Sequence, residues 1–356
     1  MRAELHTLTL LAAVLDVPVL GPLMRMLTAE PRVDSDTIAG VPVEVLRPGG
    51  RGPWPTVVFA NGAHPLRRRE PLVQRFTSGL ARAGHLVVVP DLPGLGDGEI
   101  TVDTLDGLLR VIRATVDRDD VRGRRVALVG ASTGASLSLV AAGQPDGARH
   151  ISAVIAVAPF NDLGKIVCLA TTRSYPDDGR FVGYPVEKFE RRIIARSLVA
   201  ALAPADRTLL RAALDRADID GVDPIDTLVW RDDLGPAAGS LLALLTNHDP
   251  ERYEDLRAKL PPDVRAAILR LSPSAVGGEI AVPVEIIVAP HDLYFPRPEA
   301  LSLARLVRTA HLTVTATLDH TRPHASLKDL PDFGRFLRCV VRSVALAGGL
   351  TGVERA

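Results

Sequence analysis

The residues most suited to chemistry centre on a serine that stands between two glycines. The stretch "GASTG" (130–134) puts Ser132 directly after an apolar run and before a segment with helical spacing. A nucleophile on such a strand-to-helix turn sits in a strained backbone conformation that lifts its hydroxyl above the sheet edge. The pattern predicts a nucleophile at Ser132. A turn of small residues that lets a helix pack closely on a sheet would have the same sequence.

A serine hydroxyl needs a base to take its proton, and this base is usually a histidine oriented by a carboxylate. Two later apolar runs end in suitable residues. "VEIIVAP" is followed by His291 and Asp292, and "LTVTATL" is followed by Asp319 and His320. We therefore expect His320 to be the base and Asp292 to be the acid that orients it.

Other residues compete for both roles. Asp162 follows the predicted strand "AVIAVAP" and is an alternative acid, while His324 is an alternative base. Asp319 is adjacent to His320, but neighbouring side chains in a strand point in opposite directions.

Backbone N–H groups are expected to stabilise the negative charge that develops on a carbonyl oxygen. The N–H of Thr133 lies at a helix start, where N–H groups are free and the helix dipole is positive. A second donor is expected in the turn after "TVVFA", from Ala63 or from Gly62. The Asn61-Gly62 pair would also suit an ordinary turn.

The sequence predicts no cofactor and no metal. His64, His291 and His320 end predicted strands but lack the close spacing of metal ligands. Cys168 and Cys339 are far apart, which suggests neither a disulfide framework nor a zinc site. The glycine-rich "PDLPGLGDG" does not have the dinucleotide pattern, and no phosphate-binding P-loop motif occurs.

Strands and helices alternate along the part of the chain that carries these residues. Two short strands around a glycine turn are expected at 32–50. Buried strands are then expected at 55–65, 85–99, 124–130 and 151–160, and helices at 70–84, 104–117 and 135–143. This alternation predicts an α/β fold with a doubly wound, mostly parallel sheet, whose strand ends share one edge.

The pattern changes between 161 and 278, where we expect a helical insertion with helices at 186–202, 206–217, 239–247 and 262–271. The sheet resumes with a strand at 282–292, a helix at 298–308, a last strand at 312–324 and a closing helix at 332–347. The predicted organisation is an N-terminal apolar helix (1–30), a core (31–160 and 279–356) and a helical cap (161–278).

Residues 33–160 and 280–345 resemble the α/β-hydrolase fold superfamily. The stretches that carry the resemblance are "VVFANGAHP", "VVVPDLPGLGDG", "ALVGASTGAS", "IIVAPHDLYFP" and "LDHTRP". The order Ser132, Asp292, His320 is the one expected in such proteins. Their acid often stands in a D-x-x-x-P turn, which Asp292 and Pro296 match.

The resemblance implies hydrolysis of a carboxylic ester or related acyl bond without a cofactor. The inserted segment is similar to the cap of a little-characterised branch of bacterial hydrolases, which leaves the substrate open. Many members have His-Gly where this chain has Asn61-Gly62, so no lipase subgroup is indicated. An acyltransferase with the same triad and a non-catalytic ligand-binding protein remain alternatives.

Composition restricts the partners. The chain has 356 residues, with 42 Lys and Arg and 42 Asp and Glu, so no overall charge attracts nucleic acid. The expected partner is a small-molecule acyl substrate. Residues 5–27 are apolar but interrupted by Asp16, Pro18 and Pro22, which predicts an amphipathic helix on the domain or on a membrane surface. We expect a cytoplasmic protein that could associate with a membrane.

Overall fold

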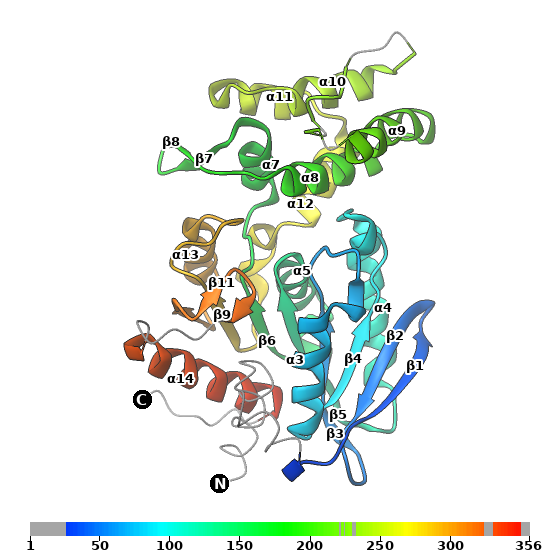
Figure 1. Cartoon of the computed structure of the whole chain (residues 1–356), viewed down its shortest axis with the longest axis vertical. Coiled ribbons are helices and arrows are strands. Elements are labelled where there is room, and N and C mark those ends of the chain that lie inside the picture. Colours follow the sequence, from blue (N-terminus) through cyan, green and yellow to red (C-terminus); the bar gives the residue numbers. More distant parts are fainter. Residues whose placement is uncertain (1–25, 221, 224, 230–232, 324–329, 350–356) are drawn as a thin grey trace.

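A computed structural model describes residues 26–220, 222–223, 225–229, 233–323 and 330–349. Eight strands form the central sheet: β1 (Arg32–Ile38), β2 (Val41–Arg47), β3 (Trp54–Ala60), β4 (Leu86–Pro90), β5 (Val121–Ala131), β6 (Ile151–Val157), β9 (Val284–Val288) and β10 (Ala310–Val314). Their order is β1-β2-β4-β3-β5-β6-β9-β10 (Figure 1). The β1-β2 and β2-β4 pairs are antiparallel and the other neighbours are parallel, which confirms the predicted mostly parallel sheet.

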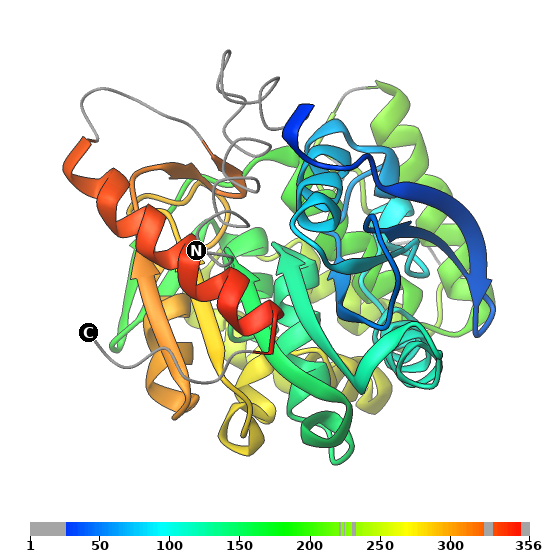
Figure 2. The same cartoon turned by 90° about the horizontal axis from the view of Figure 1, so that it is seen from below.

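Helices cover both faces of this sheet (Figure 2). One face carries α3 (Pro71–Arg82) and α14 (Leu330–Ala347), and the other carries α4 (Val102–Val116), α5 (Thr133–Ala142) and α13 (Arg297–Leu306). Side chains alternate in direction along a strand. Val57 and Phe59 of β3 therefore pack in the cluster that includes α3 and α14, whereas Val58 and Ala60 pack in the cluster that includes α4 and α5.

The segment between β6 and β9 is mostly helical and lies at one end of the molecule (Figure 1). It contains α7 (Leu163–Thr172), α8 (Lys188–Ala200), α9 (Pro204–Asp220), α10 (Pro236–Leu245), α11 (Tyr253–Ala258) and α12 (Pro262–Arg270). A hairpin of β7 (Ser174–Asp177) and β8 (Arg180–Gly183) was not expected. The strand β8 is exposed along its whole length, so its sequence does not have the continuous apolar run that indicates a core strand.

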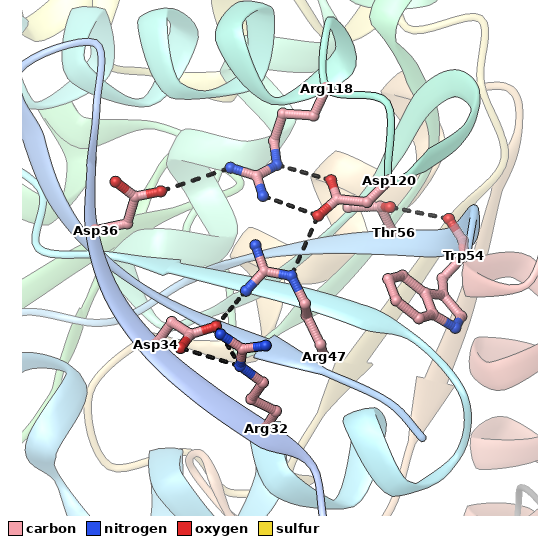
Figure 3. Close-up of polar contacts among 8 residues, drawn as sticks. All are labelled: Arg32, Asp34, Asp36, Arg47, Trp54, Thr56, Arg118 and Asp120. Carbon is pink, nitrogen blue, oxygen red and sulfur yellow. Dashed lines mark hydrogen bonds and ion pairs between the residues drawn. The ribbon is translucent and has the colours of Figure 1, made fainter. Parts of the chain in front are cut away.

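A network of ion pairs ties the antiparallel strands to the turn that precedes β5 (Figure 3). The guanidinium of Arg118 donates two hydrogen bonds to Asp120, of 2.8 and 2.9 Å. Arg47 links Asp120 to Asp34, and Arg118 also lies 3.6 Å from Asp36. The hydrogen bonds from Arg118 are the largest effect that lowers the pKa of Asp120 below its usual value. The network fixes the edge of the sheet farthest from β10.

The last predicted strand, 312–324, is wrong in its length. The sheet strand β10 ends at Val314 because its partner β9 ends at Val288, and Thr315 N–H donates the last hydrogen bond to the Val288 carbonyl. The chain then turns into a separate two-stranded hairpin, β11 (Leu318–Asp319) and β12 (Arg322–Pro323). His320 therefore lies in the turn of this hairpin and not directly after a sheet strand.

Residues 1–25 lie outside the described part of the chain, so the membrane contact predicted for 5–27 stays a prediction. None of the helices that the structure describes is long and apolar enough to cross a bilayer.

Candidate active site

Ser132 occupies the sharp turn between β5 and α5. Its φ of 54° and ψ of −124° fall in a backbone region that residues other than glycine rarely adopt. A Cβ at Gly134 would lie 2.1 Å from the carbonyl oxygen of Ala60, and one at Gly130 would lie 2.5 Å from the Cα of Ala135. Both glycines are therefore required by the packing of this turn, as the motif predicts.

The structure brings the three predicted side chains into one chain of hydrogen bonds. Ser132 Oγ lies 2.9 Å from His320 Nε2, and His320 Nδ1 lies 2.9 Å from Asp292 Oδ2. An ionised carboxylate can only accept, so Nδ1 must carry the proton and donate it to Asp292. Nε2 is then left as the acceptor for the hydroxyl hydrogen of Ser132.

Asp292 is held in place by its own loop. Its Oδ1 accepts hydrogen bonds from the N–H groups of Tyr294 (2.8 Å) and Phe295 (3.0 Å), which explains the tight turn before Pro296. Burial by itself would raise the pKa of Asp292. The hydrogen bond and charge of His320, together with the two N–H donors, outweigh burial and hold this pKa below its usual value. Asp292 is thus an ionised carboxylate at neutral pH.

Among the described residues, neither competing acid is hydrogen-bonded to His320, although Asp319 lines the same cavity. Asp162 caps the N-terminus of α7 by accepting from the N–H groups of Gly164 and Lys165. Asp319 is exposed. His324 belongs to the residues that the structure does not describe.

The two predicted backbone donors lie beside Ser132 and line the same cavity. Gly62 N–H donates to its neighbour Asn61 Oδ1 at 2.9 Å, so this N–H is already engaged. Among the described residues, no hydrogen-bond acceptor is found for the N–H groups of Ala63 and Thr133. Of the two donors considered in this turn, Ala63 is therefore the one left for a ligand.

A cavity of about 400 Å³ opens at Ser132. Its wall is mostly apolar and includes residues of α8, such as Phe189 and Ile193. Charged groups in the wall include Glu190 from α8 and Arg322 from the β11–β12 hairpin. A cavity of this size and polarity is typical of a small-molecule site.

Sequence reasoning did not identify the residues that surround Ser132, His320 and Asp292 from the segment between β6 and β9 and from the Asp292 loop. The ring of Tyr294 lies 4.5 Å from that of His320, centroid to centroid, and the hydroxyl of Tyr184 donates to the backbone oxygen of Asp292. Burial raises the pKa of Tyr184 to about 12 and that of Glu190 to about 8. Tyr294 could have been found from the D-x-x-x-P turn, since it lies inside that turn. Tyr184 and Glu190 carry no local motif.

Within the described residues no group of three His, Cys, Asp or Glu side chains could hold a metal ion. Of the three histidines that end predicted strands, His64 and His320 line the cavity, whereas His291 is exposed. His64 Nδ1 accepts from the N–H of Leu66. Cys168 and Cys339 are both buried and free.

Comparisons with known proteins agree with this architecture. A family model described as alpha/beta hydrolase fold matches residues 72–311. No curated protein matches the sequence.

Several solved structures are similar to the chain. An acylaminoacyl peptidase from Pyrococcus horikoshii has a TM-score of 0.52 at 13% identity, over 94% of this chain and 44% of that one. A puromycin-hydrolyzing peptidase from Mycobacterium tuberculosis has a TM-score of 0.50 at 17% identity, over 91% and 40%. An esterase from Pyrobaculum calidifontis has a TM-score of 0.49 at 16% identity, over 92% and 90%. At these identities the likeness to the two peptidases shows the fold alone.

Proposed function

The chain belongs to the α/β-hydrolase fold family, and on this premise we propose that it is a serine hydrolase that cleaves a carboxylic ester or related acyl bond. The observation that carries the proposal is the line of hydrogen bonds from Ser132 through His320 to Asp292, with 2.9 Å at each step. A hydroxyl aimed at an imidazole nitrogen that carries no proton is ready to lose its own proton as it attacks.

In the proposed mechanism Ser132 Oγ attacks the carbonyl carbon while His320 Nε2 takes the hydroxyl proton. Asp292 stabilises the imidazolium that forms. The N–H groups of Ala63 and Thr133 stabilise the negative oxygen of the tetrahedral intermediate, and the loss of one such donor typically costs about 2.7–4 kcal/mol of barrier. His320 then protonates the leaving group, and an acyl-enzyme remains.

Water resolves the acyl-enzyme by the same route. His320 takes a proton from the water, whose oxygen attacks the acyl carbon, and the Ser132 oxygen leaves and regains a proton from His320. The mostly apolar cavity wall would also suit an alcohol acceptor in place of water. Acyl transfer is therefore the second candidate, and analysis of products with added alcohols distinguishes it from hydrolysis.

The test of the proposal is labelling with a fluorophosphonate probe, with the adduct located by peptide mass. We expect one adduct on Ser132 in the wild type and none in Ser132→Ala. Ser240→Ala is a matched control, because the Ser240 hydroxyl donates to the carbonyl of Pro236 within its own helix, α10, and does not line the cavity. A wild-type protein that is folded and not labelled would contradict the proposal and favour the ligand-binding alternative.

A further inference from the structure

The cavity at Ser132 is lined by residues from both hydrophobic clusters of the protein. One part of its wall belongs to the cluster of α4, α5 and the cap, and includes Phe160, Leu163 and Ile193. The other part lies on the opposite face of the sheet, between the strands and the helices α3 and α14. We call this second part the α14 pocket; it is formed by Phe59, Phe76, Val129, Ile155, Phe336, Val340 and Ser343.

The α14 pocket follows one side of α14. Phe336, Val340 and Ser343 are spaced four and three residues apart, so they lie on the same face of the helix. From Phe336 to Ser343 the helix advances about 10 Å at 1.5 Å per residue. Figure 2 shows α14 crossing the lower face of the sheet apart from α3. The pocket therefore extends from the catalytic edge along the helix.

The chemistry of the α14 pocket is that of a hydrocarbon site. None of its seven residues is charged, and the rings of Phe59 and Phe76 lie 5.5 Å apart on its α3 side. The only polar side chain of the seven is Ser343, whose buried hydroxyl oxygen has no hydrogen-bond partner among the described residues. A pocket of apolar walls favours an apolar chain by removing its surface from water.

We propose that the α14 pocket binds the acyl chain of the substrate, an inference that rests on the proposed hydrolase function. An extended chain advances about 1.3 Å per bond, because consecutive Cα atoms, three bonds apart, are separated by about 3.8 Å. A pocket that follows about 10 Å of helix therefore accommodates an acyl chain of roughly eight bonds. The acyl part stays attached to Ser132 while the alcohol leaves and water enters. A site between helix and sheet suits the group that stays.

The experiment compares hydrolysis of p-nitrophenyl esters from acetate to decanoate by the wild type and by two variants of one residue. Val340→Phe fills the pocket and Val340→Ala enlarges it. We expect Val340→Phe to lower the octanoate-to-acetate ratio of kcat/KM about tenfold, as for loss of roughly two buried methylene groups. We expect Val340→Ala to shift the preferred chain to a longer one. Arg338→Phe is the matched control, since Arg338 is exposed on the same helix and does not line the cavity.

Two results would overturn the inference and leave the proposed function intact. One is an active, labelled enzyme whose chain-length ratio in both Val340 variants equals that of Arg338→Phe. The other is a shift that appears with acetates of long-chain alcohols and not with long-chain acyl groups. A wild type that is neither labelled at Ser132 nor active on any ester would overturn the proposed function itself.

Discussion

Replacing Asp292 by asparagine tests the proposed mechanism at the atom that decides the tautomer of His320. Oδ1 of Asp292 accepts two backbone N–H groups, from Tyr294 and Phe295, and lies 3.0 Å from His320 Nδ1, while Oδ2 lies 2.9 Å from the same nitrogen and accepts no backbone N–H group among the described residues. In Asp292→Asn the two N–H donors still need an oxygen. The amide oxygen therefore takes the Oδ1 position, and the NH₂ group takes the Oδ2 position, 2.9 Å from His320 Nδ1.

The consequence is a histidine that can no longer act as a base. An NH₂ group donates to Nδ1, so the imidazole proton moves to Nε2 and the acceptor for the Ser132 hydroxyl is lost. The equivalent change in a serine protease triad lowers kcat by about 10⁴, which is roughly 5 kcal/mol of barrier. We expect a loss of this order for Asp292→Asn in steady-state ester hydrolysis at pH 7.

Asp162→Asn is the control, because asparagine also caps a helix and Asp162 does not contact His320. We expect Asp162→Asn to retain wild-type turnover. Asp292→Asn with activity within about tenfold of the wild type, or a larger loss in Asp162→Asn, would refute the assignment of the acid.

Two further predictions concern stability. Gly134→Ala would bring a Cβ to 2.1 Å from a backbone oxygen, and we expect it to lower the free energy of unfolding by at least about 2 kcal/mol. Gly278→Ala, with nothing within 4 Å, should change it little in the same denaturation experiment. For Glu190, burial raises the pKa to about 8, so the native state keeps a proton that the unfolded chain releases near pH 4. Its contribution to stability is full below about pH 4 and is lost as the pH rises through 8. Relative to Glu190→Gln, the wild-type melting temperature should therefore fall between pH 4 and pH 9, and parallel curves would contradict this.

Much of the candidate site could be predicted because its residues carry local signals. The close packing of one turn requires glycine at both 130 and 134. Asp292 lies in a turn that is formed with the three residues that follow it. Such constraints act within a few residues and therefore leave a pattern in the sequence. The sheet was predictable for a similar reason, since strands buried on both faces are continuous apolar runs.

The rest depends on contacts between distant parts of the chain. The strand β10 ends where its partner β9 ends, because Val314 pairs with Val288, which lies 26 residues earlier in the chain. The threonine-rich run after Val314 has the residue types of a strand, so its sequence predicted that the strand continues. The α14 residues that line the cavity fit an ordinary amphipathic pattern. Whether such a face packs fully or leaves a pocket depends on the distance to α3, which no local pattern records.

Ser132 and His320 share a backbone feature that connects stability to the proposed chemistry. Both have a positive φ, of 54° and 52°, and their side chains meet at 2.9 Å. For His320 this is the left-handed turn between β11 and β12, which histidine tolerates better than most residues. For Ser132 it is the sharp turn between β5 and α5, where Gly134 lies close to the backbone of β3. The strain belongs to the backbone and not to the hydroxyl, so the Ser132→Ala protein should keep the turn, and its loss of labelling would report on the missing nucleophile and not on a changed fold.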